Sequence, residues 1–288
     1  MTQGINNEYR ASIVEYYDSC EIDYRMLWRL DRCMAMHFGY WDETTKGVSD
    51  ALLRENQILS QRVNITAADK VLDAGCGVGG SSIWLAKNIG CQVTGITLSL
   101  HQVDVATRNA IKHHAADKAK FEARDFTATG YPDASFDVVW AVEAVCHAED
   151  KADFIREAYR ILKPGGRLIV ADFFAAKASF PAEDQLLMDE WADGWSIKAF
   201  GYSGAFRQAM ETTGFADIQM QDASDNVRPS AKRLYQYSLF AKWGAKLLTL
   251  LRIRNAAQYG NVRAVHRQWL ALNRGLWHYG IFSARKPG

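Results

Sequence analysis

An apolar run that leads straight into a glycine-rich turn constrains this chain more than any other feature. Residues Val71 to Ala74 are followed by Gly75, Cys76, Gly77, Val78, Gly79 and Gly80. Gly75, Gly77 and Gly80 satisfy the pattern G-x-G-x-x-G, in which glycines let the backbone approach a ligand at the N-terminus of a helix. This stretch therefore predicts a strand, a tight turn and a helix, in that order.

From Lys70 onward, short β-rich runs alternate with helical stretches. Strands are expected at residues 71–74, 93–97, 120–123, 136–142, 167–173, 216–221 and 277–284. Helices are expected at 81–88, 100–113 and 151–162, and the Pro-Gly-Gly sequence at 164–166 breaks the last of them from the next strand. The alternation predicts an α/β fold with a Rossmann-like, doubly wound, mostly parallel seven-stranded sheet.

Helical patterns flank this core. Apolar and aromatic residues recur at helical spacing through residues 6–63, and about fifty basic, amphipathic residues separate the last two strands. We expect four parts: an N-terminal helical cap at 1–63, the core at 64–226, a basic helical cap insertion at 227–276 and the final core strand at 277–288. Both helical parts are expected to cover the carboxyl edge of the sheet.

The acidic residue of a nicotinamide site is missing. In dinucleotide enzymes an acid about 20 positions after the turn binds the ribose. The corresponding region here, Val93 to Thr97, contains none. This absence, together with Asp73 two residues before the first glycine, favours S-adenosylmethionine, a cofactor that has no phosphate. The alternative is a turn that only packs the helix on the strand.

Several further stretches accompany the turn. They are His37 to Trp41, Thr94 to Thr97 with Gln102, Val142 to Ala148, and Leu162 to Gly166. Together with residues 73–80 they resemble class I methyltransferases, and in particular the sterol and tocopherol C-methyltransferases and the prenyl diphosphate C-methyltransferases. The resemblance covers about residues 35–175. It is specific for the cofactor and only weakly specific for the acceptor.

The resemblance implies a set of cofactor-binding residues, namely Tyr17, Asp73, Gly75, Gly77, Thr97, Gln102, Asp125 and Phe126. The two glycines would line the methionine and ribose portion, while Thr97 and Gln102 would take over the ribose contacts of the missing acid. Asp125 and the residue after it would meet the adenine, unless Asp125 is a turn residue. Tyr17 resembles an N-terminal tyrosine that closes over the cofactor in related enzymes, and a core aromatic is the alternative.

Two titratable residues, Glu143 and His147, follow the predicted fourth strand, at the edge where doubly wound sheets bind ligands. Methyl transfer relies on positioning and desolvation and requires no metal, and a base is needed only if the product loses a proton. We expect Glu143 to be that base and, with an alkene acceptor, to stabilise the carbocation. The alternatives are a cofactor contact for Glu143 and an acceptor contact or a structural role for His147.

Aromatic residues gather where a cap would close over this edge. We expect substrate contacts from His37, Tyr40, Trp191 and Trp195. Such a set favours an apolar or aromatic acceptor over a small polar one. The expected reaction is C-methylation of a small apolar or isoprenoid-type molecule.

The C-terminal fifth of the chain carries charge of one sign. Residues 226–288 hold twelve Lys or Arg and no Asp or Glu, although the net charge of the whole chain is only +1. Such a field attracts an anionic partner. We expect Arg228 and Arg233 to hold the phosphates of a prenyl diphosphate, or the segment to dock on an anionic bilayer if the acceptor is a neutral lipid. Recognised nucleic-acid motifs are absent.

Other functions remain open. An O- or N-methyltransferase of a small natural product would use the same fold, with His147 as its base. A cyclopropane-type lipid synthase ranks lower because residues 168–173 lack a histidine, and a non-catalytic membrane-binding module is the alternative outside enzymes. The sequence selects neither the acceptor nor the oligomeric state.

Cysteine usage and the N-terminal residues bear on the compartment. Five cysteines without C-x-x-C spacing predict reduced thiols rather than a disulfide framework or a zinc site. The polar N-terminus lacks the pattern of a secretory signal, and no apolar run approaches the ~20 residues that span a bilayer. The expected location is cytoplasmic.

Overall fold

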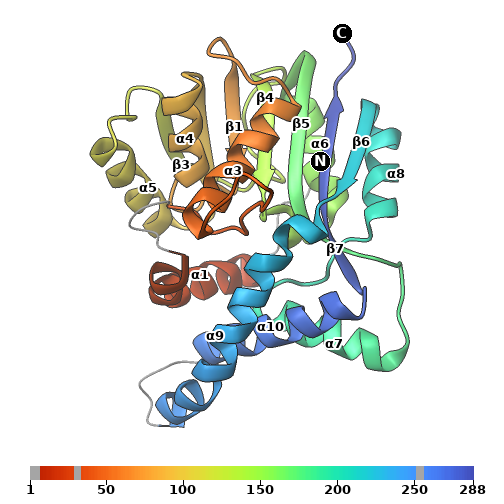
Figure 1. Ribbon diagram of the computed structural model, residues 1–288. Coiled ribbons are helices and arrows are strands. Elements are labelled where there is room, and N and C mark those ends of the chain that lie inside the picture. The colour runs from red at the N-terminus through yellow and green to blue at the C-terminus, as the bar shows by residue number, and fades with distance from the viewer. Residues whose placement is uncertain (1–6, 29–33, 251–255) are drawn as a thin grey trace.

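The computed structural model describes residues 7–28, 34–250 and 256–288, and it confirms the predicted sheet (Figure 1). Seven strands lie in the order β3-β2-β1-β4-β5-β7-β6, and β7 alone runs antiparallel to its neighbours. The strands are β1 (Lys70–Ala74), β2 (Gln92–Thr97), β3 (Ala119–Ala123), β4 (Phe136–Val142), β5 (Leu162–Ala175), β6 (Ala216–Asp222) and β7 (Trp277–Arg285). Strand β5 begins earlier than expected because Leu162 already pairs with Phe136 at the start of β4, before a register shift after which Arg167 pairs with Val138.

Helices cover both faces of the sheet and one of its edges. They are α1 (Asn7–Trp28), α3 (Val48–Arg62), α4 (Gly80–Asn88), α5 (Leu100–Lys112), the 3-10 helix η1 (Val145–His147), α6 (Lys151–Ile161), α7 (Ala182–Gly194), α8 (Ser203–Thr213), α9 (Ser224–Leu250) and α10 (Ala256–Asn273). Successive strand residues point to opposite faces. Val71 and Val138 accordingly join the cluster formed with α3, α4 and α5, whereas Leu72 and Val139 join the cluster formed with α6 and α8.

A helical cap lies at the carboxyl edge of the parallel strands. Helices α1, α7, α9 and α10 lie together there, below the sheet in Figure 1. Helix α10 packs against α7, α9 and α1. Helix α7, which sequence reasoning placed inside the core part, therefore belongs to the same cap. None of the helices in the described ranges is both long and apolar enough to cross a membrane.

Residues 34–47 correct the expectation of helix throughout 6–63. This segment is irregular and runs between α3 and α9, with the Tyr40 N–H donating to Ala51 O at 3.0 Å and the Trp41 N–H to Asn226 O at 2.9 Å. A Cβ added at Gly39 would lie 2.7 Å from the Cβ of Ala51. The close approach to α3 therefore requires glycine, and apolar spacing alone did not reveal it.

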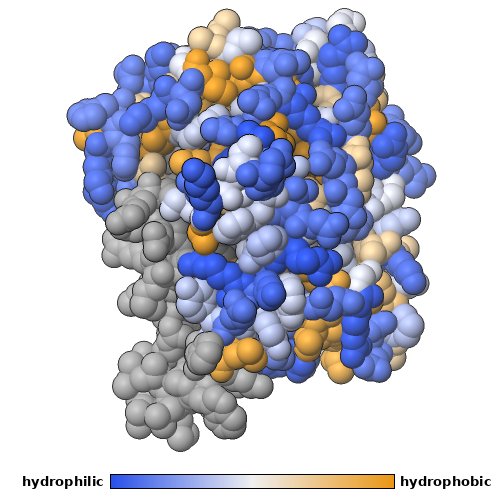
Figure 2. All heavy atoms as spheres, in the orientation of Figure 1, coloured by the Kyte–Doolittle hydropathy of each residue, from blue (hydrophilic) through white to orange (hydrophobic). Residues whose placement is uncertain are grey.

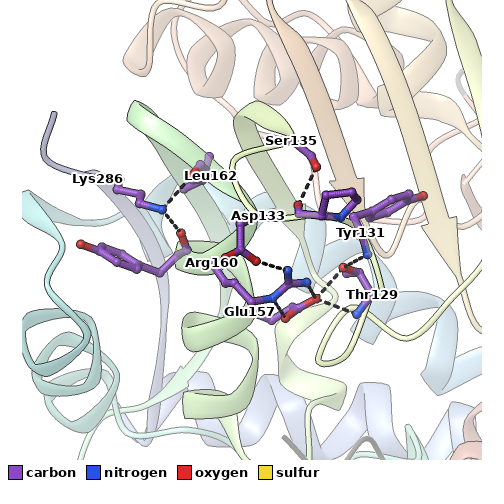
Figure 3. A network of polar contacts seen from close by, with 10 residues as sticks. Thr129, Tyr131, Asp133, Ser135, Glu157, Arg160, Leu162 and Lys286 are labelled. Carbon is purple, nitrogen blue, oxygen red and sulfur yellow. Dashed lines mark hydrogen bonds and ion pairs between the residues drawn. The ribbon is translucent and has the colours of Figure 1, made fainter. Parts of the chain in front are cut away.

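Several basic residues in the described part of the C-terminal segment are paired within the chain. Acidic residues of α7 meet basic residues on and just after α10, with Arg267 of α10 at 2.7 Å from Glu190 and Arg274, which follows α10, at 2.9 Å from Asp184. Lys286 donates to the carbonyl oxygens of Tyr159 and Leu162 at the end of α6 (Figure 3). Intramolecular pairing therefore explains part of the one-sign composition without an external anion.

The outer surface is mainly polar. Hydrophilic side chains cover most of the face shown in Figure 2, where hydrophobic ones form small separate patches.

Cys76, Cys91 and Cys146 are buried free thiols, as expected. Cys20 and Cys33 lie outside the residues whose side chains are described.

Candidate active site

The glycine turn has the backbone that the sequence motif demands. The N–H groups of Gly75 and Cys76 both donate to Ile96 O at 2.9 Å, which ties the turn to the end of β2. Gly75 has φ +93°, and an added Cβ would lie 2.3 Å from the Cβ of Ala144. Only glycine fits this position, because it combines a left-handed backbone with a close neighbour.

A large cavity opens above this turn. Its empty volume is about 860 Å³, and it is bordered by the turn, the ends of β1, β2 and β4, helix α1 and residues 34–37. The sequence-predicted residues that line it are Tyr17, His37, Asp73, Gly75, Gly77, Thr97, Gln102, Phe126, Glu143 and His147. The structure therefore brings together, around one space, residues that span 130 positions of sequence from Tyr17 to His147.

Polar groups of the large cavity are fixed by local contacts. The Thr97 hydroxyl donates to Gln102 Oε1 at 2.6 Å, which leaves the amide N–H groups of Gln102 available as donors. Asp73 accepts from Ser82 Oγ at 2.6 Å, and burial raises the pKa of Asp73 to about 6. Asp125 closes a turn by accepting from the backbone N–H and the hydroxyl of Thr127, and it does not line the cavity. Asp125 is therefore placed as a turn residue, which was the alternative to its predicted contact with adenine.

A smaller, aromatic cavity adjoins the large one. Its empty volume is about 390 Å³, and its lining is Tyr16, Tyr17, Met36, Phe38, Glu143, Cys146, His147, Phe173, Trp195 and Ile197. Four residues border both cavities, namely Tyr17, Met36, Glu143 and His147. They form the shared wall, across which a group could pass from one cavity to the other.

His147 is oriented by a contact on each ring nitrogen. Nδ1 lies 3.3 Å from the carbonyl oxygen of Ser196, and Nε2 lies 2.8 Å from the hydroxyl of Tyr17. A carbonyl only accepts, so Nδ1 carries the hydrogen and Nε2 presents a lone pair. Burial lowers the pKa of His147 to about 4. The imidazole is therefore neutral at physiological pH, with its acceptor nitrogen at the shared wall.

Glu143 belongs to a buried network that sequence reasoning missed in part. Its Oε1 accepts from the Phe38 N–H at 2.6 Å and lies 3.0 Å from the Tyr279 hydroxyl. That hydroxyl is also 2.6 Å from Glu55 Oε1, and Glu55 Oε2 is 2.7 Å from His37 Nδ1. Glu55 on α3 and Tyr279 on β7 are fully buried, and nothing in their local sequence distinguishes them from core residues.

His37 carries a positive charge at neutral pH. Burial alone lowers its pKa, but the Glu55 carboxylate outweighs burial and raises the pKa to about 9. His37 thus faces α3 through its Nδ1 while its ring borders the large cavity.

This raised pKa predicts a loss of stability in alkali. The folded protein holds the His37 proton more tightly than the unfolded chain, whose pKa is near 6.5, so the stabilisation is full below pH 6.5 and is lost as pH rises toward 9. We expect the free energy of unfolding to fall over this window by an amount on the order of 1 kcal/mol or more. Urea titrations at pH 6.5 and pH 9 measure it, and His37→Gln should show a flatter profile. An identical slope in both proteins contradicts the assignment.

Helix α1 covers both cavities and is held by polar contacts to distant parts of the chain. Tyr16 donates to Asn261 Oδ1 on α10 at 3.1 Å, and Asp18 accepts from Ser99 at the start of α5 at 2.8 Å. The Tyr9 hydroxyl donates to Ser196 O and accepts from the Lys198 N–H. Tyr17 lies between the cavities, as a residue that closes over a ligand would.

The predicted substrate residues divide into two groups. His37 borders the large cavity and Trp195 the small one. Trp191 is fully buried behind Phe173, at 5.6 Å between ring centroids, and Tyr40 is buried with its hydroxyl 3.4 Å from Gln221. Neither lines either cavity, so both are packing residues.

The expectation that Arg228 and Arg233 face the site is wrong. Arg228 pairs with Asp225 at 3.4 Å, one helical turn away, and also contacts Asn273. The guanidinium of Arg233 lies 5.0 Å from the ring centroid of Tyr237 on the same helix. Neither lines the two cavities, because α9 turns these side chains toward its own neighbours.

Comparisons with known proteins agree with this geometry. A family model described as a methyltransferase domain matches residues 72–170. The chain is 34% identical to 27-O-demethylrifamycin SV methyltransferase of Amycolatopsis mediterranei, over 68% of this chain and 71% of that protein. It is 36% identical to 2-methyl-6-phytyl-1,4-hydroquinone methyltransferase of Synechocystis, over 74% of this chain and 67% of that protein.

A solved structure shares the fold across the whole chain. It is geranyl diphosphate C-methyltransferase of Streptomyces coelicolor in complex with Mg²⁺, geranyl diphosphate and S-adenosylhomocysteine. The TM-score is 0.74 at 17% identity, and the likeness covers 99% of this chain and 100% of that one.

Proposed function

The chain belongs to the class I S-adenosylmethionine-dependent methyltransferases, and from this premise we propose that it methylates a hydroxyl group of a small, largely apolar acceptor, with His147 as general base. The observation that carries the proposal is the orientation of His147, whose Nδ1 is anchored on Ser196 O while Nε2 presents a lone pair at the shared wall.

The large cavity fits S-adenosylmethionine. Its lining combines apolar side chains with a few convergent polar groups, as small-molecule sites usually do, and Gly75 on its border has no room for a Cβ beside Ala144. Asp73, Thr97, Gln102 and Phe126 would hold the cofactor through polar contacts at the strand ends and one buried ring. When bound, the cofactor supplies an electrophilic methyl group.

The proton of the reaction is accounted for by His147. As the oxygen of the acceptor forms its bond to the methyl group, the hydroxyl proton passes to Nε2. The products are the methyl ether, S-adenosylhomocysteine and a protonated His147, which then returns its proton to water. The Tyr17 hydroxyl now occupies the hydrogen-bonding position on Nε2, so an acceptor hydroxyl would take its place.

The walls of the smaller cavity support an apolar acceptor. Phe173, Trp195 and Ile197 present hydrocarbon surface, and Phe173 is itself packed among five other aromatic rings. A rigid aromatic wall of this kind excludes water and holds a planar or hydrocarbon group by contact area. The relative named 27-O-demethylrifamycin SV methyltransferase supports hydroxyl methylation, because the acceptor in its name lacks a methyl group on an oxygen.

C-methylation is the second candidate, because Glu143 also borders both cavities. An aromatic or isoprenoid carbon must lose a proton after methylation, and Glu143 is close enough to the shared wall to take it. A relative named sterol 24-C-methyltransferase supports this alternative.

Transfer of a ¹³C-labelled methyl group tests the proposal. The protein is incubated with labelled S-adenosylmethionine and a panel of phenols, hydroquinones, prenyl diphosphates and sterols, and each product is examined by NMR. A methoxy carbon signal is expected from a hydroxyl-bearing member. A signal from a methyl group on carbon supports the second candidate and overturns the first.

A further inference from the structure

Two carboxyl groups approach one hydroxyl beneath the shared wall. Glu143 Oε1 and Glu55 Oε1 lie 3.0 Å and 2.6 Å from the Tyr279 hydroxyl oxygen. The three residues come from the turn after β4, from α3 and from β7, so the contact requires the complete fold. The hydroxyl has one hydrogen and therefore donates to only one of the two carboxyls.

The number of hydrogen-bond donors at this contact indicates that Glu143 also carries a proton. Glu55 already has two donors, since Oε2 faces His37 Nδ1 and Oε1 faces Tyr279 at the shorter distance. If Tyr279 donates to Glu55, its oxygen presents a lone pair toward Glu143. An ionised Glu143 would then place an acceptor oxygen against the acceptor lone pair of Tyr279, whereas a protonated Glu143 can donate its hydrogen to the Tyr279 oxygen.

Charge favours the same arrangement. The positive His37 and the negative Glu55 neutralise one another, and no cation on the described residues pairs directly with Glu143. Burial, and then the charge of Glu55, raise the pKa of Glu143 well above its usual value. The titratable groups that face Glu143 or border the same cavities are Tyr16, Tyr17, His37, Glu55, Asp73, Cys76, Cys146, His147, Asp172 and Tyr279.

The position of the positive charge on the cofactor follows from the two cavities. A methyl group that leaves the large cavity for the small one must cross the shared wall, where Glu143 lies. The sulfonium that carries this methyl group therefore belongs near Glu143. A cation within about 4–6 Å of a carboxyl group favours its ionised form.

We propose that Glu143 holds a proton in the free protein, releases it when S-adenosylmethionine binds, and regains it once the charge of the sulfonium has been lost. Glu143 then acts as a charge-responsive residue that makes the site prefer the charged cofactor over its uncharged product. The inference rests on the proposed placement of the cofactor in the large cavity and of the acceptor in the smaller one, and it is independent of which atom of the acceptor is methylated.

Proton linkage predicts the direction in which pH changes the affinity for S-adenosylmethionine. The complex holds fewer protons than the free protein, so the affinity for S-adenosylmethionine rises with pH, approaching about tenfold per pH unit between the two pKa values of Glu143. S-adenosylhomocysteine has no sulfonium, and its affinity should change little over the same window.

Calorimetry measures the released proton directly. Titrations of S-adenosylmethionine and of S-adenosylhomocysteine are carried out at one pH in buffers of different ionisation enthalpy. We expect release on the order of one proton for S-adenosylmethionine and far less for S-adenosylhomocysteine. Glu143→Gln should remove the difference between the two ligands. Asp172→Asn is the matched control, because Asp172 is also a buried carboxyl with a raised pKa but lines neither cavity.

Three results would overturn the inference. They are equal proton release for both ligands, unchanged release in Glu143→Gln, and loss of the difference in Asp172→Asn. If Glu143→Gln fails to fold, the pH dependence of the two affinities in the unaltered protein decides. A ratio of affinities that stays constant from pH 6 to pH 9 then contradicts the proposal.

Discussion

Replacement of Gly75 by alanine is expected to weaken binding of S-adenosylmethionine by ~100-fold or more, a loss of about 2.7 kcal/mol. Gly75 has φ +93°, which is strained for any residue with a Cβ, and the added methyl carbon would lie 2.3 Å from the Cβ of Ala144. The turn or Ala144 must shift to relieve this contact, and because both border the large cavity, either shift changes the shape of the cofactor site. Isothermal titration of the purified variant measures the loss.

Gly165→Ala is the matched control for that prediction. Gly165 also has a left-handed φ of +76°, but a Cβ added there would have no other atom within 4 Å, and the residue borders neither cavity. The substitution should lower stability slightly and leave cofactor affinity unchanged. A Gly75→Ala protein that binds the cofactor as tightly as Gly165→Ala does would show that the turn does not form the cofactor site.

His147→Asn is expected to lower turnover by ~10³-fold, within the usual range for loss of a general base. An asparagine amide can still donate to Ser196 O in place of Nδ1, so the local fold is retained while the Nε2 lone pair is lost. The affinity for S-adenosylmethionine should change much less. Single-turnover rates with the hydroxyl acceptor identified by NMR, together with cofactor titrations, separate the two effects.

Tyr17→Phe serves as the control for His147→Asn. It removes the hydroxyl that lies 2.8 Å from Nε2 and leaves the imidazole in place. If His147 is the base, Tyr17→Phe should retain far more activity than His147→Asn. Equal losses in the two variants would point to their mutual contact, rather than to proton transfer, as the functional requirement.

The strands and helices of the central sheet could be predicted from the sequence, because the glycine turn and the alternation of β-rich and helical runs depend on residues that are adjacent in the chain. Apolar spacing failed at residues 34–47, because the Gly39 approach to Ala51 is a contact between segments rather than a pattern within one. The same spacing could not reveal that α7 joins the cap.

The site was predictable where its residues follow a strand. Glu143 and His147 come directly after β4, and the ends of parallel strands meet at one edge. Glu55 and Tyr279 reach the site from the middle of a helix and from an antiparallel strand, so only the folded chain brings them to Glu143. The prediction that Arg228 and Arg233 hold a phosphate group went astray because composition shows the sign of a charge but not the residue that pairs with it.

The pairing of α7 with α10 constrains how this enzyme can be recombined with its relatives. The acidic residues of α7 lie between β5 and β6, and their basic partners on and just after α10 lie between β6 and β7. Trp195, which follows α7 directly, lines the smaller cavity. A chimera that imports only one of the two segments would leave charged residues without their ion-pair partners at the edge of the smaller cavity. Transplanting acceptor selectivity into this scaffold therefore requires exchanging the two insertions as a unit, although the sixth strand separates them in sequence.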